Sequence, residues 1–197
     1  MYIPKKQQTM SKEAYRDLWT SFINGDDGAM KLLYTEFADM LYSFGLRFTT
    51  DTELVKDAIQ DLFVDLFKYH RTLAIEVNVK SYLFTSLKRK ICLVLKKRAA
   101  EINQHFEIPF LLSGSMEEQI INDERQSELL GKLSRQLELL PSRQKEALYL
   151  RFNSELDYEE ISAIMNVSLE TCRTLVYRGI KQLRERMVVS HIYKILA

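Results

Sequence analysis

Six polar side chains in the last third of the sequence have the types and spacing needed to contact nucleic acid. They are Thr171, Arg173, Thr174, Tyr177, Arg178 and Lys181. Threonine, tyrosine and arginine can reach base edges in a major groove, while a row of further basic side chains suits phosphate oxygens. We therefore expect these residues to share one face and to bind DNA.

The sequence around these residues predicts an amphipathic helix over 166–185. Its apolar residues recur at three- and four-residue steps and are Leu169, Cys172, Val176, Ile180 and Leu183. Such a row packs on a core and turns the polar row outward. Ser168 is a good N-cap, because its hydroxyl can accept a hydrogen bond from a free amide of the first turn.

A second, shorter helix is expected just before this one. Asp157 and Glu160 have the spacing of a capping box. Asn166 ends the apolar pattern, and asparagine tolerates the left-handed backbone of a tight turn, with Val167 buried beneath it. Two helices joined in this way form a helix-turn-helix. A helical hairpin with a solvated polar face is the alternative, but such a face would carry more acidic residues.

A further helix is predicted over 51–70, with Asp51 as its cap. Its apolar row comprises Leu54, Ala58, Ile59, Leu62, Phe63, Leu66 and Phe67. The opposite face carries Lys56 and an acidic strip of Asp57, Gln60, Asp61 and Asp65. Simple solvation and docking onto a basic partner helix both fit this strip.

An apolar loop over 73–78 then leads into a helix that Asn78 can cap. Leu83, Leu87, Ile91 and Leu95 pack this helix. Its outer side carries Lys80, Tyr82, Lys88, Arg89, Lys96, Lys97 and Arg98. Aromatic and cationic groups together suit single-stranded nucleic acid, which is held by stacking and by backbone charge. A lysine-rich, solvated helix end remains an equal alternative for this stretch alone.

The chain as a whole predicts an all-α protein of two helical domains. Residues 1–98 form the first domain. Two further helices are expected in it, around 14–23 and 27–48, and the first of these buries Trp19. Residues 127–197 form the second, and 99–126 form an acidic linker. Net charges of +4, −6 and +3 over residues 1–98, 99–130 and 131–197 support this division. An apolar cluster in the linker should fold back on the domains, and it comprises Phe106, Ile108, Phe110, Leu111 and Leu112.

Several classes of protein do not fit the sequence. Cys92 and Cys172 fall in apolar rows, so we expect buried thiols rather than a disulfide or a metal site, which suits a reducing cytoplasm. The N-terminal residues have no apolar signal region, and no stretch approaches the roughly 18 apolar residues of a membrane span. A phosphate-binding glycine-rich loop is absent. We expect no cofactor, no catalytic residues and no membrane insertion.

Three segments resemble two regions of bacterial sigma factors of the extracytoplasmic-function (ECF) group. Residues 140–185 (LPSRQKEALYLRFNSELDYEEISAIMNVSLETCRTLVYRGIKQLRE) resemble sigma region four. Residues 57–70 (DAIQDLFVDLFKYH) and 79–91 (VKSYLFTSLKRKI) resemble region two. The spacing leaves no room for a folded region three, as in that group. The resemblance departs at Tyr82, where the family usually has tryptophan, and at Lys90, where it has asparagine.

The resemblance implies a role for each set of residues. It assigns core-polymerase binding to Asp57, Gln60, Asp61, Phe63 and Asp65. It assigns the loop over 73–78 to a flipped base of the minus-ten element, and minus-ten contacts to Asn78, Lys80, Tyr82, Lys88 and Arg89. It assigns minus-thirty-five recognition to Ser168, Thr171, Arg173, Thr174, Tyr177, Arg178 and Lys181.

The implied function is promoter recognition by RNA polymerase with help in DNA melting. The implied partners are core RNA polymerase, promoter DNA both as duplex and as melted non-template strand, and an anti-sigma factor. A stand-alone helix-turn-helix regulator is the main alternative, and a helical adaptor without a DNA role is the third. The paired acidic and basic faces of residues 51–98 favour the sigma factor.

Overall fold

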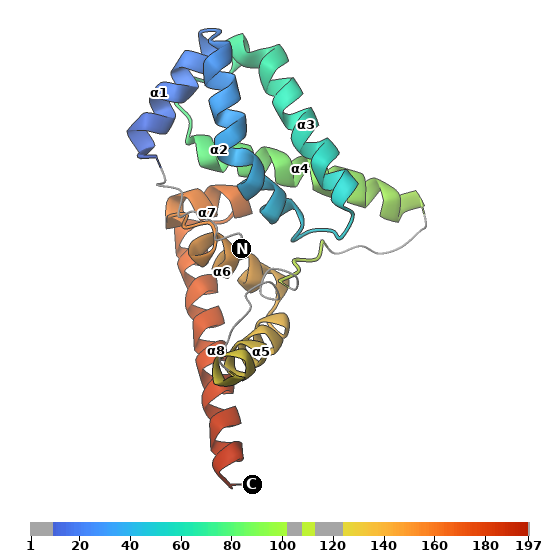
Figure 1. Cartoon of the computed structure of the whole chain (residues 1–197), viewed down its shortest axis with the longest axis vertical. Helices are drawn as coiled ribbons and strands as arrows, with labels where there is room; N and C mark the ends of the chain where they lie inside the picture. The colour runs from blue at the N-terminus through green and yellow to red at the C-terminus, as the bar shows by residue number, and fades with distance from the viewer. Residues whose placement is uncertain (1–9, 102–107, 113–123, 197) are drawn as a thin grey trace.

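The protein is described by a computed structural model that covers residues 10–101, 108–112 and 124–196. Within these ranges all regular elements are helical, as predicted. The first group is α1 (Lys12–Ile23), α2 (Asp27–Gly45), α3 (Thr52–Tyr69), the short 3-10 helix η1 (His70–Thr72) and α4 (Val79–Glu101). The second group is α5 (Glu124–Glu138), α6 (Ser142–Phe152), α7 (Tyr158–Met165) and α8 (Leu169–Leu196). Figure 1 shows the two groups meeting where α7 lies against α4.

The first domain packs α1 to α4 around an aromatic and aliphatic core. Trp19 and Phe22 are buried as predicted, and Asp51 caps α3, because its Oδ1 accepts a hydrogen bond from the amide of Leu54 at 3.0 Å. Helices α2 and α3 approach closely at Gly45. A Cβ atom at this position would lie 2.5 Å from Cγ1 of Val55, so only glycine fits without displacing a buried neighbour.

Phe67 was expected in the buried row of α3, and this prediction is wrong, because its side chain is 56% exposed. The first five residues of the predicted row are buried, and Leu66 is buried too. Phe67 lies further around the helix, at the rim of a groove between α2 and α3. Apolar residues spaced three and four apart cover a wider face of a helix than the neighbouring helices bury. The sequence does not show which residues at the border of that face stay exposed.

The second domain packs α5, α6 and α7 against the long helix α8. Its core includes Leu150, Ile161 and Cys172. Both cysteines are buried as expected, Cys172 fully and Cys92 with 8% of its surface exposed. At Gly179 of α8, an added Cβ would lie 2.9 Å from a methyl carbon of Leu148. The absence of a side chain therefore lets α8 lie directly on α6.

The described part of the linker folds back between the two domains, as predicted. Phe110 is 2% exposed, with its ring centroid 5.3 Å from that of Phe48 in the first domain and 5.6 Å from that of Tyr149 in the second. The amide of Leu111 donates to the carbonyl of Arg47 at 2.7 Å. Phe106 lies outside the described residues.

Candidate nucleic-acid interface

The helix-turn-helix is built from local signals that the sequence predicted. Asp157 and Glu160 form the capping box, since each side chain accepts from the other's amide, at 2.8 and 2.9 Å. Asn166 ends α7 in the left-handed conformation, with φ 51° and ψ 56°. Val167 is half-buried against the core. The turn therefore fixes the direction in which α8 leaves α7.

The outer face of α8 presents the predicted polar row. Thr171, Arg173, Tyr177, Arg178 and Lys181 are exposed, Thr174 is half-buried, and the Tyr177 side chain is 65% exposed. Ser168 is the cap of the helix, because its Oγ accepts from the amide of Thr171 at 3.1 Å and also lies 2.8 Å from Oγ1 of that residue. The exposed residues share the face of α8 that the sequence assigned to DNA.

One aromatic ring supports the start of this surface. The guanidinium carbons of Arg173 and Arg151 lie 5.8 and 4.9 Å from the ring centroid of Tyr158 at the start of α7. Both distances suit a cation–π contact. Tyr158 thus holds Arg173 beside the N-terminal turns of α8, where a recognition helix contacts bases. Tyr158 was not identified from the sequence. Its position directly after the capping residue Asp157 places it at the start of α7 and could have indicated it.

The start of α4 holds the residues assigned to melted DNA. Oδ1 of Asn78 accepts from the amide of Ser81 at 2.9 Å, so Asn78 caps α4 as predicted. Lys80 is half-buried with its Nζ 5.3 Å from the ring centroid of Tyr15. Tyr82 is half-buried with its ring 5.3 Å from that of Trp19. Arg89 is exposed further along the helix.

Lys88 was expected with the other basic residues on the outer side of α4, but most of its side chain is buried where the two domains meet. Its Nζ lies 2.5 Å from Oε1 of Glu146 in α6, and only 21% of its side chain is exposed. The side chain is also close to the first domain, since its Nζ lies 5.9 Å from the ring centroid of Phe48. Burial raises the pKa of the Glu146 carboxyl, and the charge of Lys88 opposes that rise.

The loop over 73–78 borders a small cavity beside α4. The indole nitrogen of Trp19 donates to the carbonyl of Ala74 at 3.0 Å and so fixes the loop to α1. The cavity has a volume of about 300 Å³, and Leu73, Tyr82 and Arg89 are among its lining residues. An aromatic wall, an apolar residue and a cation around one hollow suit an unstacked base.

The same cavity contains an ion pair that the sequence did not reveal. Nζ of Lys90 on α4 lies 2.6 Å from Oδ2 of Asp65 on α3, and both side chains are partly exposed. Asp65 belongs to the acidic strip, so the pair joins that strip to the helix assigned to melted DNA. The two residues lie 25 positions apart, a separation at which helical periodicity predicts no contact.

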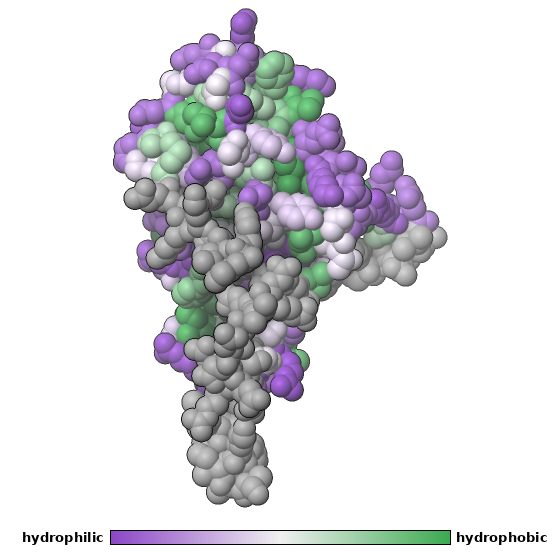
Figure 2. Space-filling model, in the orientation of Figure 1, coloured by the Kyte–Doolittle hydropathy of each residue, from purple (hydrophilic) through white to green (hydrophobic). Residues whose placement is uncertain are grey.

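The acidic strip of α3 is exposed as predicted, with Asp57, Gln60 and Asp61 open to solvent. Phe63, assigned with them, is only 5% exposed and packs on the ring of Tyr34 at 5.0 Å. Beside the strip runs the groove between α2 and α3, a cavity of about 790 Å³. Figure 2 shows hydrophobic surface among hydrophilic residues in the part of the molecule where Figure 1 draws these helices.

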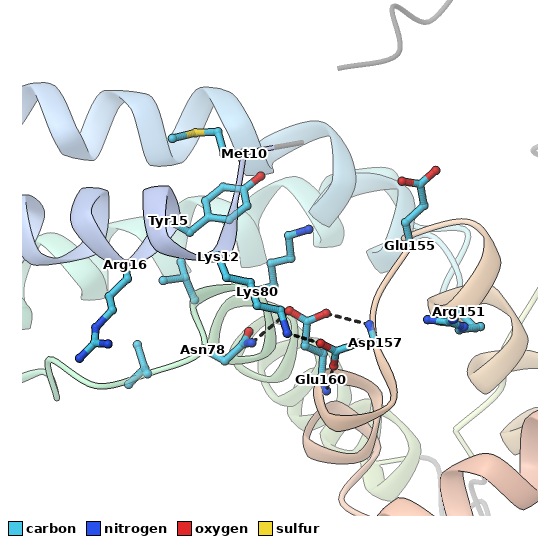
Figure 3. Close-up of a pocket in the computed structure, with 12 residues that line it drawn as sticks. Met10, Lys12, Tyr15, Arg16, Asn78, Lys80, Arg151, Glu155, Asp157 and Glu160 are labelled. Atoms are coloured by element: carbon cyan, nitrogen blue, oxygen red, sulfur yellow. Dashed lines mark hydrogen bonds and ion pairs between the residues drawn. The ribbon is translucent and has the colours of Figure 1, made fainter. Parts of the chain in front are cut away.

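Polar contacts join the start of α4 to the helix-turn-helix. Nδ2 of Asn78 donates to Oε1 of Glu160 at 3.0 Å, and the hydroxyl of Ser81 donates to the carbonyl of Glu160 at 3.4 Å. Lys12 of α1 forms an ion pair with Asp157. Figure 3 shows Asn78, Glu160, Lys12 and Asp157 gathered where the two domains meet. The residues that the resemblance assigns to the minus-ten and minus-thirty-five elements therefore lie on domains in direct contact.

Among residues 10–101, 108–112 and 124–196, no group of three or more histidine, cysteine or acidic side chains is arranged to hold a metal ion. In the same ranges, no helix has the length and apolar character needed to cross a membrane.

Comparison with known protein families matches the two domains separately. The model of sigma-70 region 2 matches residues 33–101, and the model of sigma-70 region 4 matches residues 130–183. The ECF RNA polymerase sigma factor SigM of Bacillus subtilis is 25% identical over 152 residues, which are 77% of this chain and 91% of SigM.

Two solved structures share the fold. The structure of CnrH in complex with the cytosolic domain of CnrY gives a TM-score of 0.61 at 17% identity, over 89% of this chain and 98% of that one. The sigma factor RpoE from Bartonella quintana, in complex with the anti-sigma factor NepR, gives a TM-score of 0.59 at 21% identity. That match covers 81% of this chain and 96% of RpoE.

Proposed function

Because this chain belongs to the sigma-70 family, as an ECF sigma factor that directs core RNA polymerase to promoters, we propose that α4 and α8 divide promoter recognition between them. The observation that carries this division is the distribution of cationic and aromatic residues. One set lies at the start of α4 beside a cavity, and the other lies on the exposed face of the second helix of a helix-turn-helix.

We propose that α8 binds the minus-thirty-five element as duplex DNA. Arg173 and Tyr177 lie near the N-terminal end of the helix, which enters a major groove first in this motif. Arg178, next to Tyr177, and Lys181, one turn after Tyr177, suit phosphates. Ser168 contributes through its cap, which orients the amides of the first turn, more than through a base contact.

The start of α4 and the loop over 73–78 are proposed to hold the melted minus-ten strand. The cavity beside Tyr82 would receive the flipped base, and Arg89 would neutralise the backbone next to it. Extruding a base costs a few kcal/mol, which the contacts in the cavity must offset. Tyr82 already packs on Trp19, so its ring is held in position before DNA binds.

Docking on core polymerase is proposed for the acidic strip of α3 together with the neighbouring groove. Asp57, Gln60 and Asp61 supply exposed polar contacts. Phe67 and Val64 supply exposed apolar area, since 56% and 39% of their surfaces are exposed. The sequence had placed Phe67 in the buried row, and it had not singled out Val64. An acidic rim around apolar residues fits a basic, partly apolar partner helix.

The remaining proposals concern the cellular role. The protein binds and positions, and the chemistry of RNA synthesis belongs to the polymerase, so we propose no catalytic residue in this chain. It acts in the cytoplasm, where its polymerase is. An anti-sigma factor is a further proposed partner, and it is supported by the complex with the anti-sigma factor NepR in which the similar sigma factor RpoE was solved.

Run-off transcription tests the function. Sigma-free core polymerase is given fragmented genomic DNA with and without the protein, and the 5′ ends of the transcripts are mapped. New starts behind a shared pair of upstream elements are expected. If the protein instead binds duplex DNA tightly without polymerase and yields no new starts, it is a stand-alone regulator.

A further inference from the structure

Asp65 differs from the other residues of the acidic strip on α3. The others, Asp57, Gln60 and Asp61, are exposed, whereas the Asp65 side chain is half-buried. At about 100° per residue, position 65 lies about 80° around the helix from position 57. Helices α3 and α4 pack against each other (Figure 1), and Oδ2 of Asp65 lies 2.6 Å from Nζ of Lys90 on α4. The carboxylate is therefore turned from the strip toward the cavity beside α4.

This cavity carries charge of both signs. In the described part of the chain, the charged residues that line it are Asp65, Arg89 and Lys90. Arg89 is exposed and suits the phosphate backbone, while only 28% of the Lys90 side chain is exposed. The ammonium group of Lys90 has more hydrogens than one carboxylate oxygen accepts. Lys90 therefore keeps donors for a group that enters the cavity.

The ion pair between Asp65 and Lys90 adds little to stability. Half of the Asp65 side chain is exposed, and water and salt screen an ion pair this open. The pair does restrict a lysine side chain whose long stem otherwise samples many rotamers. The carboxylate also offsets the positive charge, so a phosphate is attracted less strongly and the edge of a neutral base can compete for the ammonium. These two effects suit the recognition of a base.

A fixed ammonium group distinguishes two kinds of base. Guanine and thymine carry a carbonyl oxygen where adenine and cytosine carry an amino group. The ammonium donates to the carbonyl oxygen and is repelled by the amino hydrogens, whereas a carboxylate has the opposite preference. Lysine accordingly pairs with guanine, and acidic side chains pair with cytosine. A flipped base presents this edge to the protein because it is no longer paired.

We propose that Lys90 is a specificity-determining residue for the minus-ten strand, and that Asp65 is the positioning residue that holds its ammonium at the cavity. The proposal rests on the minus-ten role of α4 given above. It assigns a preference for guanine over adenine, or for thymine over cytosine, at the position of the strand that enters the cavity. It also moves Asp65 from polymerase docking to DNA recognition. The alternative is an ion pair that only joins α3 to α4.

Exchanging the two residues separates these possibilities. The double variant Asp65→Lys and Lys90→Asp keeps an ion pair between α3 and α4 but puts a carboxylate where the ammonium was, so the base preference should reverse. The single variants Lys90→Met and Asp65→Asn remove the ammonium and the carboxylate that holds it. The control Lys31→Met removes a positive charge from an exposed position of α2 outside the cavity, and so corrects for the general effect of charge on DNA affinity.

Holoenzyme is assembled with each variant, and fluorescence anisotropy gives its affinity for single-stranded minus-ten oligonucleotides. These come from a promoter mapped by run-off transcription and carry each of the four bases in turn at every minus-ten position. Guanine is compared with adenine and thymine with cytosine, because the members of each pair have equal ring size. At one position we expect the carbonyl base to bind about tenfold more tightly to the unmodified and control proteins. The ratio should fall below about threefold in the single variants and reverse in the exchanged variant.

The proposal is overturned if the folded exchanged variant keeps the original preference, because the ion pair is then only structural. It is also overturned if Lys90→Met leaves the preference intact, or if Asp65→Asn leaves it intact and weakens core-polymerase binding as Asp61→Asn does. Circular dichroism checks folding, and the single variants decide the question if the exchanged variant does not fold. If unmodified holoenzyme does not distinguish the minus-ten strand from a scrambled one, the minus-ten role of α4 fails and this inference fails with it. If it distinguishes them without a carbonyl preference at any position, only this inference fails.

Discussion

Replacing Phe110 by alanine should lower the free energy of unfolding by about 3 kcal/mol. Truncating a buried phenylalanine to alanine typically costs a protein about 3 to 5 kcal/mol of stability. The side chain is 2% exposed, and its ring lies 5.3 Å from Phe48 and 5.6 Å from Tyr149. The value is set at the low end of that range because a linker segment can partly collapse into the space left. The lost stability comes from the contact between the two domains, because Phe110 packs on a ring of each.

The matched control is Phe67→Ala, which removes the same atoms from a side chain that is 56% exposed. Its cost should stay below about 1 kcal/mol, as for most exposed positions. Urea denaturation of both variants and the unmodified protein gives the free energies by linear extrapolation. Equal losses for the two variants would refute the structural reasoning, since they would mean that Phe110 is no more buried in solution than Phe67.

Three further predictions concern DNA binding, packing and pH. Arg173→Ala should weaken binding of holoenzyme to the upstream element by about 1 to 3 kcal/mol if the side chain contacts a base; equal losses on scrambled DNA would indicate a phosphate contact only. Gly45→Ala should cost about 1 to 3 kcal/mol of thermal stability, because the new methyl group would collide with Val55; an unchanged melting temperature would contradict that close approach. Burial raises the pKa values of the Cys92 and Cys172 thiols above their ordinary 9.0, so the unfolded chain loses these protons first. The stability they contribute is complete below about pH 9 and is lost as the pH rises through the folded values, and urea denaturation at pH 8 and 10.5 should show this fall.

Much of the fold follows from local signals. Asp51, Asn78, Asp157 and Ser168 each cap the helix that the sequence assigned to them. Asn166 takes the left-handed conformation expected of it. These features depend on the backbone within a few residues of the side chain, so composition and spacing are sufficient to predict them.

The contacts between domains could not be predicted in this way. Lys88 and Glu146 are separated by 58 positions, and Asn78 and Glu160 by 82. Each of these residues has the polarity of a solvated helix face, and only the packing of α6 and α7 on α4 reveals that they are paired. The sequence predicted that Phe110 folds back on the domains, but not that it packs on Phe48 and Tyr149. Helical periodicity indicates which face of an element is buried and does not indicate which residues that face contacts.

Photo-crosslinking in the complex of core polymerase, this protein and a mapped promoter tests the division of promoter recognition most directly. A photoreactive phenylalanine analogue replaces Tyr177 of α8 in one protein and Arg89 of α4 in another, both exposed positions. We predict that the α8 probe crosslinks to the duplex of the minus-thirty-five element, and that the α4 probe crosslinks to the melted non-template strand at minus ten. Crosslinks from both positions to a single element, or an exchange of the two targets, would contradict the assignment of α4 and α8.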